Sequence, residues 1–347
     1  MGLQSKKRLK VIVGTLKDKA SLISSAASTS PASSAVLRAT THQPASEPAR
    51  RRHLDALLAF GHGSRPAAAS AIAAIFSRLR GTHDAAVALK CLLLAHHVAR
   101  CGSFILRDQL LSALLQPPAG GGCNPLNLSA FRDDSTADSW ALSAWVRWYA
   151  RVLEQLLSCY RATGIFLNQW NGDTQEGEEE RAASLPSADV LEEMDALVTL
   201  LEEVRRAPYA GGEAGSGLVV EVVTWVREDR AAAEKELMTR VREMGERMVC
   251  LGFGDGVVLT CLLRRLEGCR GGAAVEGELR WDVVAEVTEK VRAAMAREED
   301  EQQRRGKGGA GQVKREKASE SARIGDRVSL LSADGPLRFG STRWSDR

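Results

Sequence analysis

The sequence predicts an all-α protein: about ten helices stacked into a superhelix, or solenoid, followed by a disordered tail. Alanine, leucine, arginine and glutamate are abundant and aromatic residues make up only 5% of the chain, which favours helix over sheet. Apolar residues recur at steps of three and four in successive blocks, with short links and no fixed repeat length. Hydrophobic residues make up 44% of the chain, enough for a large core.

The first expected helix covers residues 5–23 and is amphipathic. Lys6, Lys10 and Lys17 share one face, and the other face holds Leu9, Ile12, Val13, Leu16, Ala20 and Ile23. Two interpretations are open. The helix packs on the body of the protein, or it lies on a surface of anionic lipid.

The next five helices are expected at 32–41, 50–60, 66–80, 84–101 and 103–115. The block 84–101 is apolar nearly all round, which predicts a central buried helix. The Pro- and Gly-rich segment 117–125 is a predicted loop. The longest predicted helix, 138–169, carries a stripe of aromatic and aliphatic residues that indicates a core-facing side.

An acidic linker is expected at 171–186, and four helices follow at 187–206, 217–250, 256–267 and 278–297. From residue 298 onward the apolar period stops and charge is dense, so 298–347 is expected to be disordered. Residues 1–297 are therefore the predicted domain. Its N-terminal part covers about 1–170, and its C-terminal helices cover 187–297.

No pattern in the chain is typical of an enzyme. The glycines at 120–122 lack the Lys-Ser/Thr pair that completes a phosphate loop. His96 and His97 are adjacent on a predicted helix, so their side chains diverge by about 100° and cannot share one metal ion. We therefore expect no catalysis, no metal and no other cofactor.

The seven cysteines are odd in number and none forms a C-x-x-C pair, so we expect reduced thiols, buried in apolar helices. The chain also lacks an apolar run long enough for a signal peptide or a membrane-spanning helix.

The net charge of +3 hides a strong asymmetry along the chain. Residues 1–53 hold ten lysines and arginines and two acids, a charge of +8, and the remaining residues carry −5. A basic head of this kind indicates a polyanionic partner, either a membrane surface or a nucleic acid.

The densest basic cluster, ARRRHL at 49–54, follows Pro48 and opens a predicted helix. A helix N-terminus favours phosphate groups because its N–H groups are free and its dipole is positive there. Arginine adds a planar fork for bidentate contacts, and His53 adds a further donor. Arg38, on the preceding helix, is expected to fold back beside the cluster. Charge alone would equally allow a solvated surface run without a ligand.

Residues 38–53 (RATTHQPASEPARRRH) resemble the phosphoinositide-binding signature of the ANTH domain, a member of the ENTH/ANTH superfamily found in monomeric clathrin assembly proteins. Arg38 takes the position of the signature's first lysine, and Arg50–His53 match its basic triplet and histidine. The similarity continues in order through 88–110, 127–134, 145–161, 191–201 and 253–266. It covers about 5–297 and is closest to plant members of the family.

This resemblance implies a peripheral clathrin adaptor that binds phosphatidylinositol bisphosphate and promotes clathrin-coated vesicle formation in endocytosis. The implied lipid-phosphate ligands are Arg38, Arg50, Arg52 and His53, and the implied membrane-contact residues of the first helix are Lys6, Lys7, Arg8, Lys10 and Lys17. Clathrin and a vesicle SNARE cargo are the implied partners. The expected location is the cytosolic face of plasma-membrane coated pits and vesicles, or of the Golgi. Two departures stand out: the Arg38–Arg50 spacing is about two residues longer than usual, and arginine replaces lysine throughout.

In the tail, Leu330, Leu331 and Asp334 resemble a weak clathrin-box peptide, and no NPF or DPF motif is present. A nucleic-acid-binding helical protein that uses the same basic head is the alternative. We do not expect it, because the aromatic residues form core stripes rather than alternating with the basic ones. A helical scaffold without either ligand is the third interpretation.

Overall fold

The structure is a computed structural model that describes residues 11–20, 23, 30–115, 124–164, 175–208, 216–270 and 279–308. All regular structure in this part is helical, which confirms the all-α prediction. The chain divides into two compact units, Met1–Asp300 and Glu301–Arg347. The first unit contains the core and every site discussed below.

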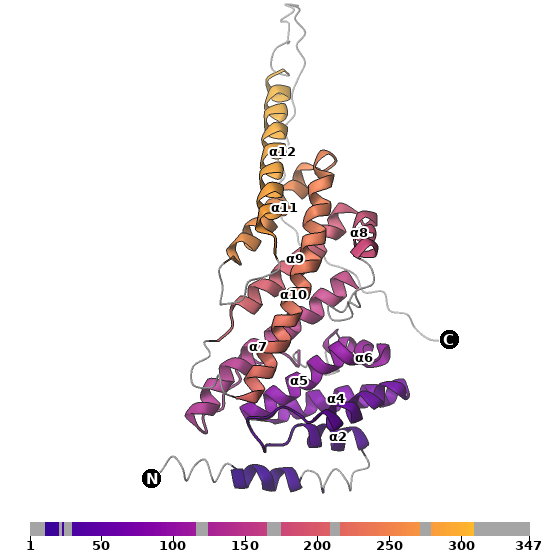
Figure 1. Cartoon of the computed structure of the whole chain (residues 1–347), viewed down its shortest axis with the longest axis vertical. Coiled ribbons are helices and arrows are strands. Elements are labelled where there is room, and N and C mark those ends of the chain that lie inside the picture. The colour runs from indigo at the N-terminus through magenta and orange to yellow at the C-terminus, as the bar shows by residue number, and fades with distance from the viewer. Residues whose placement is uncertain are drawn as a thin grey trace, which may run out of the picture. The chain divides into compact units, whose positions relative to one another are not determined.

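The N-terminal half of the first unit is built from short helices (Figure 1). After a helical segment at 11–20 come α2 (Pro31–Ala39), α3 (Arg51–Leu58), the 3₁₀ turn η1 (Ala59–His62), α4 (Arg65–Gly81), α5 (Ala85–Cys101) and α6 (Phe104–Leu115). The N-caps Ser30, Ser64 and Asp84 each accept a backbone N–H in the first turn of their helix, as such residues commonly do. Helix α4 packs on α2, α5 and α6.

Helix α5 is the central buried helix, as predicted. Nearly all of its side chains are buried, and it contacts α4, α7, α6, α10, α3 and α2. Two polar residues are buried with the apolar ones, Lys90 and His96. Each must find polar partners from neighbouring elements, because an unpaired polar group in a core is costly.

Helix α7 (Ala137–Thr163) confirms the predicted aromatic stripe, since Trp145, Trp148 and Tyr149 are buried. It ends earlier than the predicted residue 169. Gly164 adopts the left-handed conformation with φ +72°, and its N–H bonds to the carbonyl of Tyr160. Glycine adopts this conformation without steric cost and commonly ends helices in this way.

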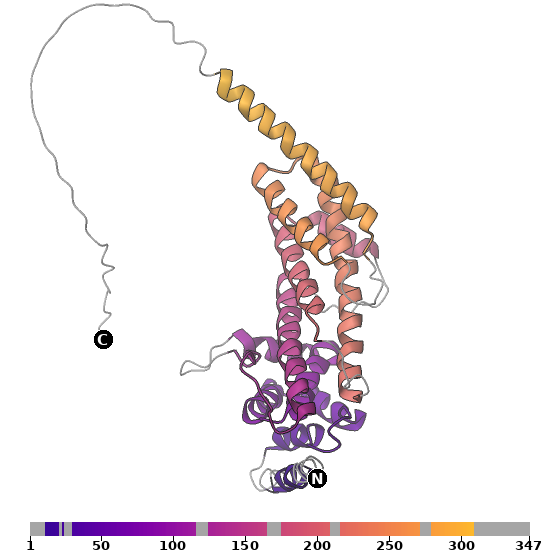
Figure 2. The same cartoon turned by 90° about the vertical axis from the view of Figure 1, so that its left-hand side faces the viewer.

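The C-terminal half consists of α8 (Gln175–Ser184), α9 (Ser187–Arg205), α10 (Gly217–Glu246), the 3₁₀ turn η3 (Arg247–Val249), α11 (Phe253–Gly268) and α12 (Trp281–Gly308). Helix α9 packs against α7, α10 and α11, and the turned view in Figure 2 shows these long helices from the side. Together with α5 and α7 they enclose one continuous hydrophobic core.

Two predictions about this half were wrong. The acidic linker contains helix α8, which is fixed by polar contacts: Arg181 pairs with Glu193 at 3.1 Å, and Arg247 donates to the carbonyls of Ala182 and Leu185 at 2.9 and 2.6 Å. Helix α12 continues past 297 to Gly308, because its glutamate, glutamine and arginine residues are strong helix formers. Residues 309–347, with the clathrin-box candidates, and 116–123 of the predicted loop lie outside the described residues.

The six cysteines in the described part of the chain are all free, as expected. Their predicted burial holds only for some of them. Cys91 and Cys159 are buried, and burial raises the pKa of each thiol to about 12, whereas Cys101, Cys250 and Cys261 are exposed. Apolar neighbours in sequence did not distinguish a core position from the outer face of the same helix.

Candidate anion-binding site

The structure brings together residues from α2 and α3 around an open hollow of about 730 Å³. Arg38 lies in the last turn of α2, and Arg52 and His53 lie in the first turn of α3. These three residues line the hollow with Pro31, Ser34, Ala35, Thr41 and Ala56. Arg50 is the N-cap of α3 beside them but is not part of the lining.

The N-terminus of α3 adds its own positive potential. Arg50 makes no side-chain capping bond, and the first turn of the helix contains no acidic residue. The first N–H groups of a helix have no partner within it, and the helix dipole is positive at this end. The chain therefore presents an uncapped helix start beside a row of arginines, an arrangement that favours anions.

His53 connects the two helices beside the hollow that it lines. Arg52 Nε donates to His53 Nε2 at 3.2 Å, and the ring also hydrogen-bonds to the backbone of Arg38. Partial burial lowers the pKa of His53, and the charges of Arg52, Arg50 and Arg38 lower it further. Among the described residues none forms an ion pair with Arg38, Arg50 or Arg52, so their positive charge is not compensated within the site.

Lys90, a buried residue of α5, holds the segment between α2 and α3 in place. Its Nζ donates to the carbonyls of Thr41 and Pro44 at 2.8 and 2.7 Å. Desolvation by burial lowers the pKa of Lys90 to about 8. The sequence analysis did not predict this role. The available signal was a lysine inside a helix that is otherwise apolar all round, since a buried charge needs partners.

The helical segment at 11–20 turns its large apolar residues away from the body. Its apolar residues Val11, Ile12, Val13 and Leu16 are exposed, Leu16 to 60%, whereas Gly14 and Asp18 are buried against the body. The helix therefore packs on the body, as one of the two interpretations predicts, but through the face that carries Gly14 and Asp18. Lys17 is exposed on this helix, and Lys6, Lys7, Arg8 and Lys10 lie outside the described residues.

His96 and His97 diverge as expected. His96 is buried between Tyr149 and Asp229, whereas His97 stacks on Trp225 with ring centroids 5.7 Å apart. Within the described ranges, no group of three or more histidine, cysteine, aspartate or glutamate side chains has a metal-binding arrangement. In the same part of the chain, no helix combines the length and the apolar character needed to cross a bilayer.

Residues 32–223 match the model of the ANTH domain, and this range contains Arg38, Arg50, Arg52 and His53. The match extends over α2–α9 and into α10, so it covers the helices that form the hollow. The chain belongs to the ANTH-domain family of clathrin assembly proteins, in its plant form.

Three similar proteins are from Arabidopsis thaliana, and each is described as a "putative clathrin assembly protein". One is 41% identical over 352 residues, which covers 96% of this chain and 94% of the relative. A second is 29% identical over 75% of this chain and 77% of its own length. The third is 27% identical over 79% of this chain and 93% of its own length. The first comparison extends well beyond the ANTH match at both ends.

Proposed function

We propose that this protein is a peripheral membrane adaptor that binds phosphatidylinositol bisphosphate and promotes the assembly of clathrin-coated vesicles in endocytosis. The observation that carries the proposal is the hollow between α2 and α3. There Arg38, Arg52 and His53 meet beside an uncapped helix start, without acidic side chains to neutralise them. The clathrin part of the proposal is supported by the relatives, which are described as clathrin assembly proteins.

The magnitude of the charge effect explains why binding of one lipid headgroup is not enough for stable recruitment to a membrane. Each basic residue near an anionic surface contributes about 1 kcal/mol. Arg38, Arg50 and Arg52, together with His53 once it is protonated, would then contribute about 4 kcal/mol, a dissociation constant of about 1 mM. Stable recruitment therefore needs further attachments, and reversible binding suits a coat that must disassemble.

The helical segment at 11–20 is the first such attachment. Its exposed Ile12 and Leu16 would enter the lipid at headgroup level, and Lys17 would contact anionic lipid, as would Lys6, Lys7, Arg8 and Lys10. Clathrin contact through Leu330, Leu331 and Asp334 would be the second. The protein would act at the cytosolic face of plasma-membrane coated pits and vesicles, or of the Golgi.

Exposed apolar residues near η3 and α11 favour a helical cargo segment such as a vesicle SNARE. Val249 is 96% exposed, and Phe253, Val257 and Val258 are exposed nearby on α11. A hollow of about 420 Å³ next to them is lined by apolar residues such as Met248, Leu251 and Met295. Amphipathic helices bind such surfaces through their apolar face. A pull-down of the full chain with a soluble vesicle SNARE fragment tests this part, and Val249→Glu should weaken the complex.

Flotation of the full chain with lipid vesicles tests the main proposal. Arg50→Glu with Arg52→Glu should abolish binding to vesicles that contain the bisphosphorylated lipid and leave the circular dichroism spectrum unchanged. The matched control is Arg227→Glu with Arg264→Glu, which makes the same change in charge at two exposed positions on α10 and α11. Unchanged flotation of the first variant would contradict the assignment. Competition with soluble inositol phosphate and with RNA distinguishes this function from nucleic-acid binding.

A further inference from the structure

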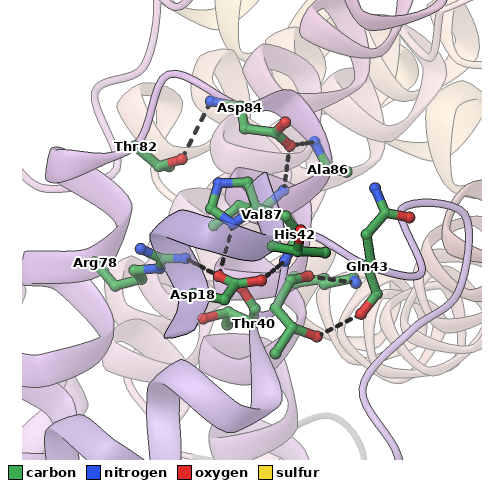
Figure 3. Close-up of polar contacts among 12 residues, drawn as sticks. Asp18, Thr40, His42, Gln43, Arg78, Thr82, Asp84, Ala86 and Val87 are labelled. Carbon is green, nitrogen blue, oxygen red and sulfur yellow. Dashed lines mark hydrogen bonds and ion pairs between the residues drawn. The ribbon is translucent and has the colours of Figure 1, made fainter. Parts of the chain in front are cut away.

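Asp18 attaches the helical segment 11–20 to the body through three polar contacts (Figure 3). The backbone N–H of His42 donates to Asp18 Oδ2 at 2.8 Å, and the His42 ring Nδ1 lies 2.7 Å from Oδ1. Arg78, from α4, approaches Oδ1 at 3.4 Å. Both carboxylate oxygens are therefore used by groups from outside this helix.

The attachment is made by the face of the helix that lacks large apolar residues. Gly14 lies one turn before Asp18 on the same face, and a Cβ at Gly14 would come within 2.8 Å of His42 Cβ. A glycine is therefore required for this close approach. Ile12 and Leu16 are also one turn apart, but on the opposite face, where Leu16 is 60% exposed.

The outward orientation of the apolar face indicates what kind of surface the helix contacts. Apolar side chains gain free energy when they leave water, and a helix that only contributed to the core would turn them inward. Here polar contacts fix the helix and leave its apolar face uncovered by any described part of the chain. The exposed lysines Lys17 and Lys19 lie on the same helix, which is the charge pattern suited to an anionic bilayer.

The same short segment of chain serves the helix and the basic hollow. Thr41 lines the hollow, and the backbone N–H of the next residue, His42, donates a hydrogen bond to Asp18. Lys90 holds this segment from the core through the carbonyls of Thr41 and Pro44, and Arg78 reaches both Asp18 and the carbonyl of Thr40. The position of the helix is thus defined relative to the residues that would bind phosphate.

We infer that Asp18 is a positioning residue: through His42 and Arg78 it fixes the N-terminal helix with its apolar face outward, so that the helix and the basic hollow form one preformed lipid-binding surface. The inference rests on the proposed function. When two weak attachments are held in fixed geometry, binding through the first places the second close to the membrane. The second contact then costs little additional entropy. The occupant is a bilayer that presents both phosphate headgroups and apolar chains.

A double-mutant cycle on the full chain tests this inference with two ligands. The first ligand is soluble inositol hexakisphosphate, measured by calorimetry. The second is a phosphatidylcholine vesicle that contains phosphatidylserine and phosphatidylinositol bisphosphate, measured by flotation. The variants are Asp18→Asn, Ile12→Ser with Leu16→Ser, and all three changes together. Glu47→Gln, an exposed carboxylate in the same basic head, is the charge-matched control.

Asp18→Asn should weaken vesicle binding roughly tenfold, and its inositol phosphate affinity should stay within about twofold of wild type, because only the membrane engages both attachments. Ile12→Ser with Leu16→Ser should weaken vesicle binding roughly tenfold in the wild-type background but only about twofold beside Asp18→Asn. The Glu47→Gln control should behave as wild type with both ligands.

Three results would overturn the inference. If the losses of vesicle affinity in Asp18→Asn and in Ile12→Ser with Leu16→Ser multiply when all three changes are combined, Asp18 does not act through the helix. An equal loss of inositol phosphate affinity would mean that Asp18 only supports the hollow, and vesicle binding of Asp18→Asn at the wild-type level would remove its role altogether. In each case the proposed function survives. If wild-type protein binds neither ligand, the proposed function fails and the inference fails with it.

Discussion

Nε2 of His96 lies 2.7 Å from Oδ2 of Asp229, and both side chains are about 1% exposed. The pair joins α5 to α10, and Tyr149 of α7 contacts the other ring nitrogen of His96 at 2.7 Å. Arg100 approaches the second oxygen of Asp229 at 3.2 Å and lies over the ring of Trp225. One buried polar cluster therefore connects the short N-terminal helices to the long C-terminal ones.

Removal of Asp229 should destabilise the fold strongly. Asp229→Ala leaves His96 without its carboxylate partner and Arg100 with Glu228 alone, and the loss of one member of a buried pair costs about 3–5 kcal/mol. Glu228→Ala is the matched control, because Glu228 also pairs with Arg100 but is half exposed. It should cost no more than about 1 kcal/mol. Urea unfolding followed by circular dichroism measures both, and equal losses would contradict the prediction.

Arg38 should contribute to headgroup binding despite the longer spacing to Arg50. It lines the same hollow as Arg52, because the extra residues are accommodated in the segment between α2 and α3. Arg38→Ala and Arg52→Ala should each weaken binding of soluble inositol phosphate by roughly three- to tenfold, the loss of one charge-assisted contact. Calorimetry checks this. A wild-type affinity for Arg38→Ala would show that the spacing removes Arg38 from the site.

His53 should make headgroup binding depend on pH. Burial and three arginines hold its pKa below the usual 6.5 in the free protein, and a bound phosphate would raise it. Binding therefore takes up a proton, and affinity should rise as the pH falls from about 7.5 to about 5.5. The phosphate itself loses charge near pH 6, so the informative quantity is the affinity of wild type relative to His53→Gln. A ratio that stays constant with pH would contradict the prediction.

Lys90→Met should loosen the segment beside the hollow. It removes both hydrogen bonds from Nζ to the carbonyls of Thr41 and Pro44, at a cost of about 2–4 kcal/mol. The pKa of Lys90 falls from 10.5 to about 8 on folding, so between these values the unfolded chain binds more protons. Wild-type stability relative to Lys90→Met should therefore rise with pH across that window. Unfolding at several pH values measures this, and a falling difference would count against the lowered pKa.

Helix positions could be predicted because apolar periodicity reflects burial directly. The stripe with Trp145, Trp148 and Tyr149 and the buried helix α5 are the clear cases. Periodicity identifies the apolar face of a helix but not what covers it, which is why the orientation of the segment 11–20 could not be predicted. Helix α8 was missed because its composition is typical of a linker. Its fixation depends on Arg181 and Arg247, whose partners are remote in sequence or on other helices.

The basic residues of the site could be predicted, but not how they are supported. Arg38, Arg52 and His53 follow from a local pattern of charge, whereas the contacts of Lys90 and Asp18 join positions 24 to 60 residues apart. Such contacts depend on the tertiary arrangement of helices. In the sequence, these contacts are indicated only by a lysine within an apolar helix and by an acidic residue within a basic segment.

Helix α5 carries Lys90 in its second turn and His96 toward its end. A force that pulls on a headgroup in the hollow would pass through the Thr41–Pro44 segment to Lys90, along α5, and through His96 and Asp229 to α10. A curving membrane would therefore pull on the most deeply buried helix of the protein rather than on a surface loop.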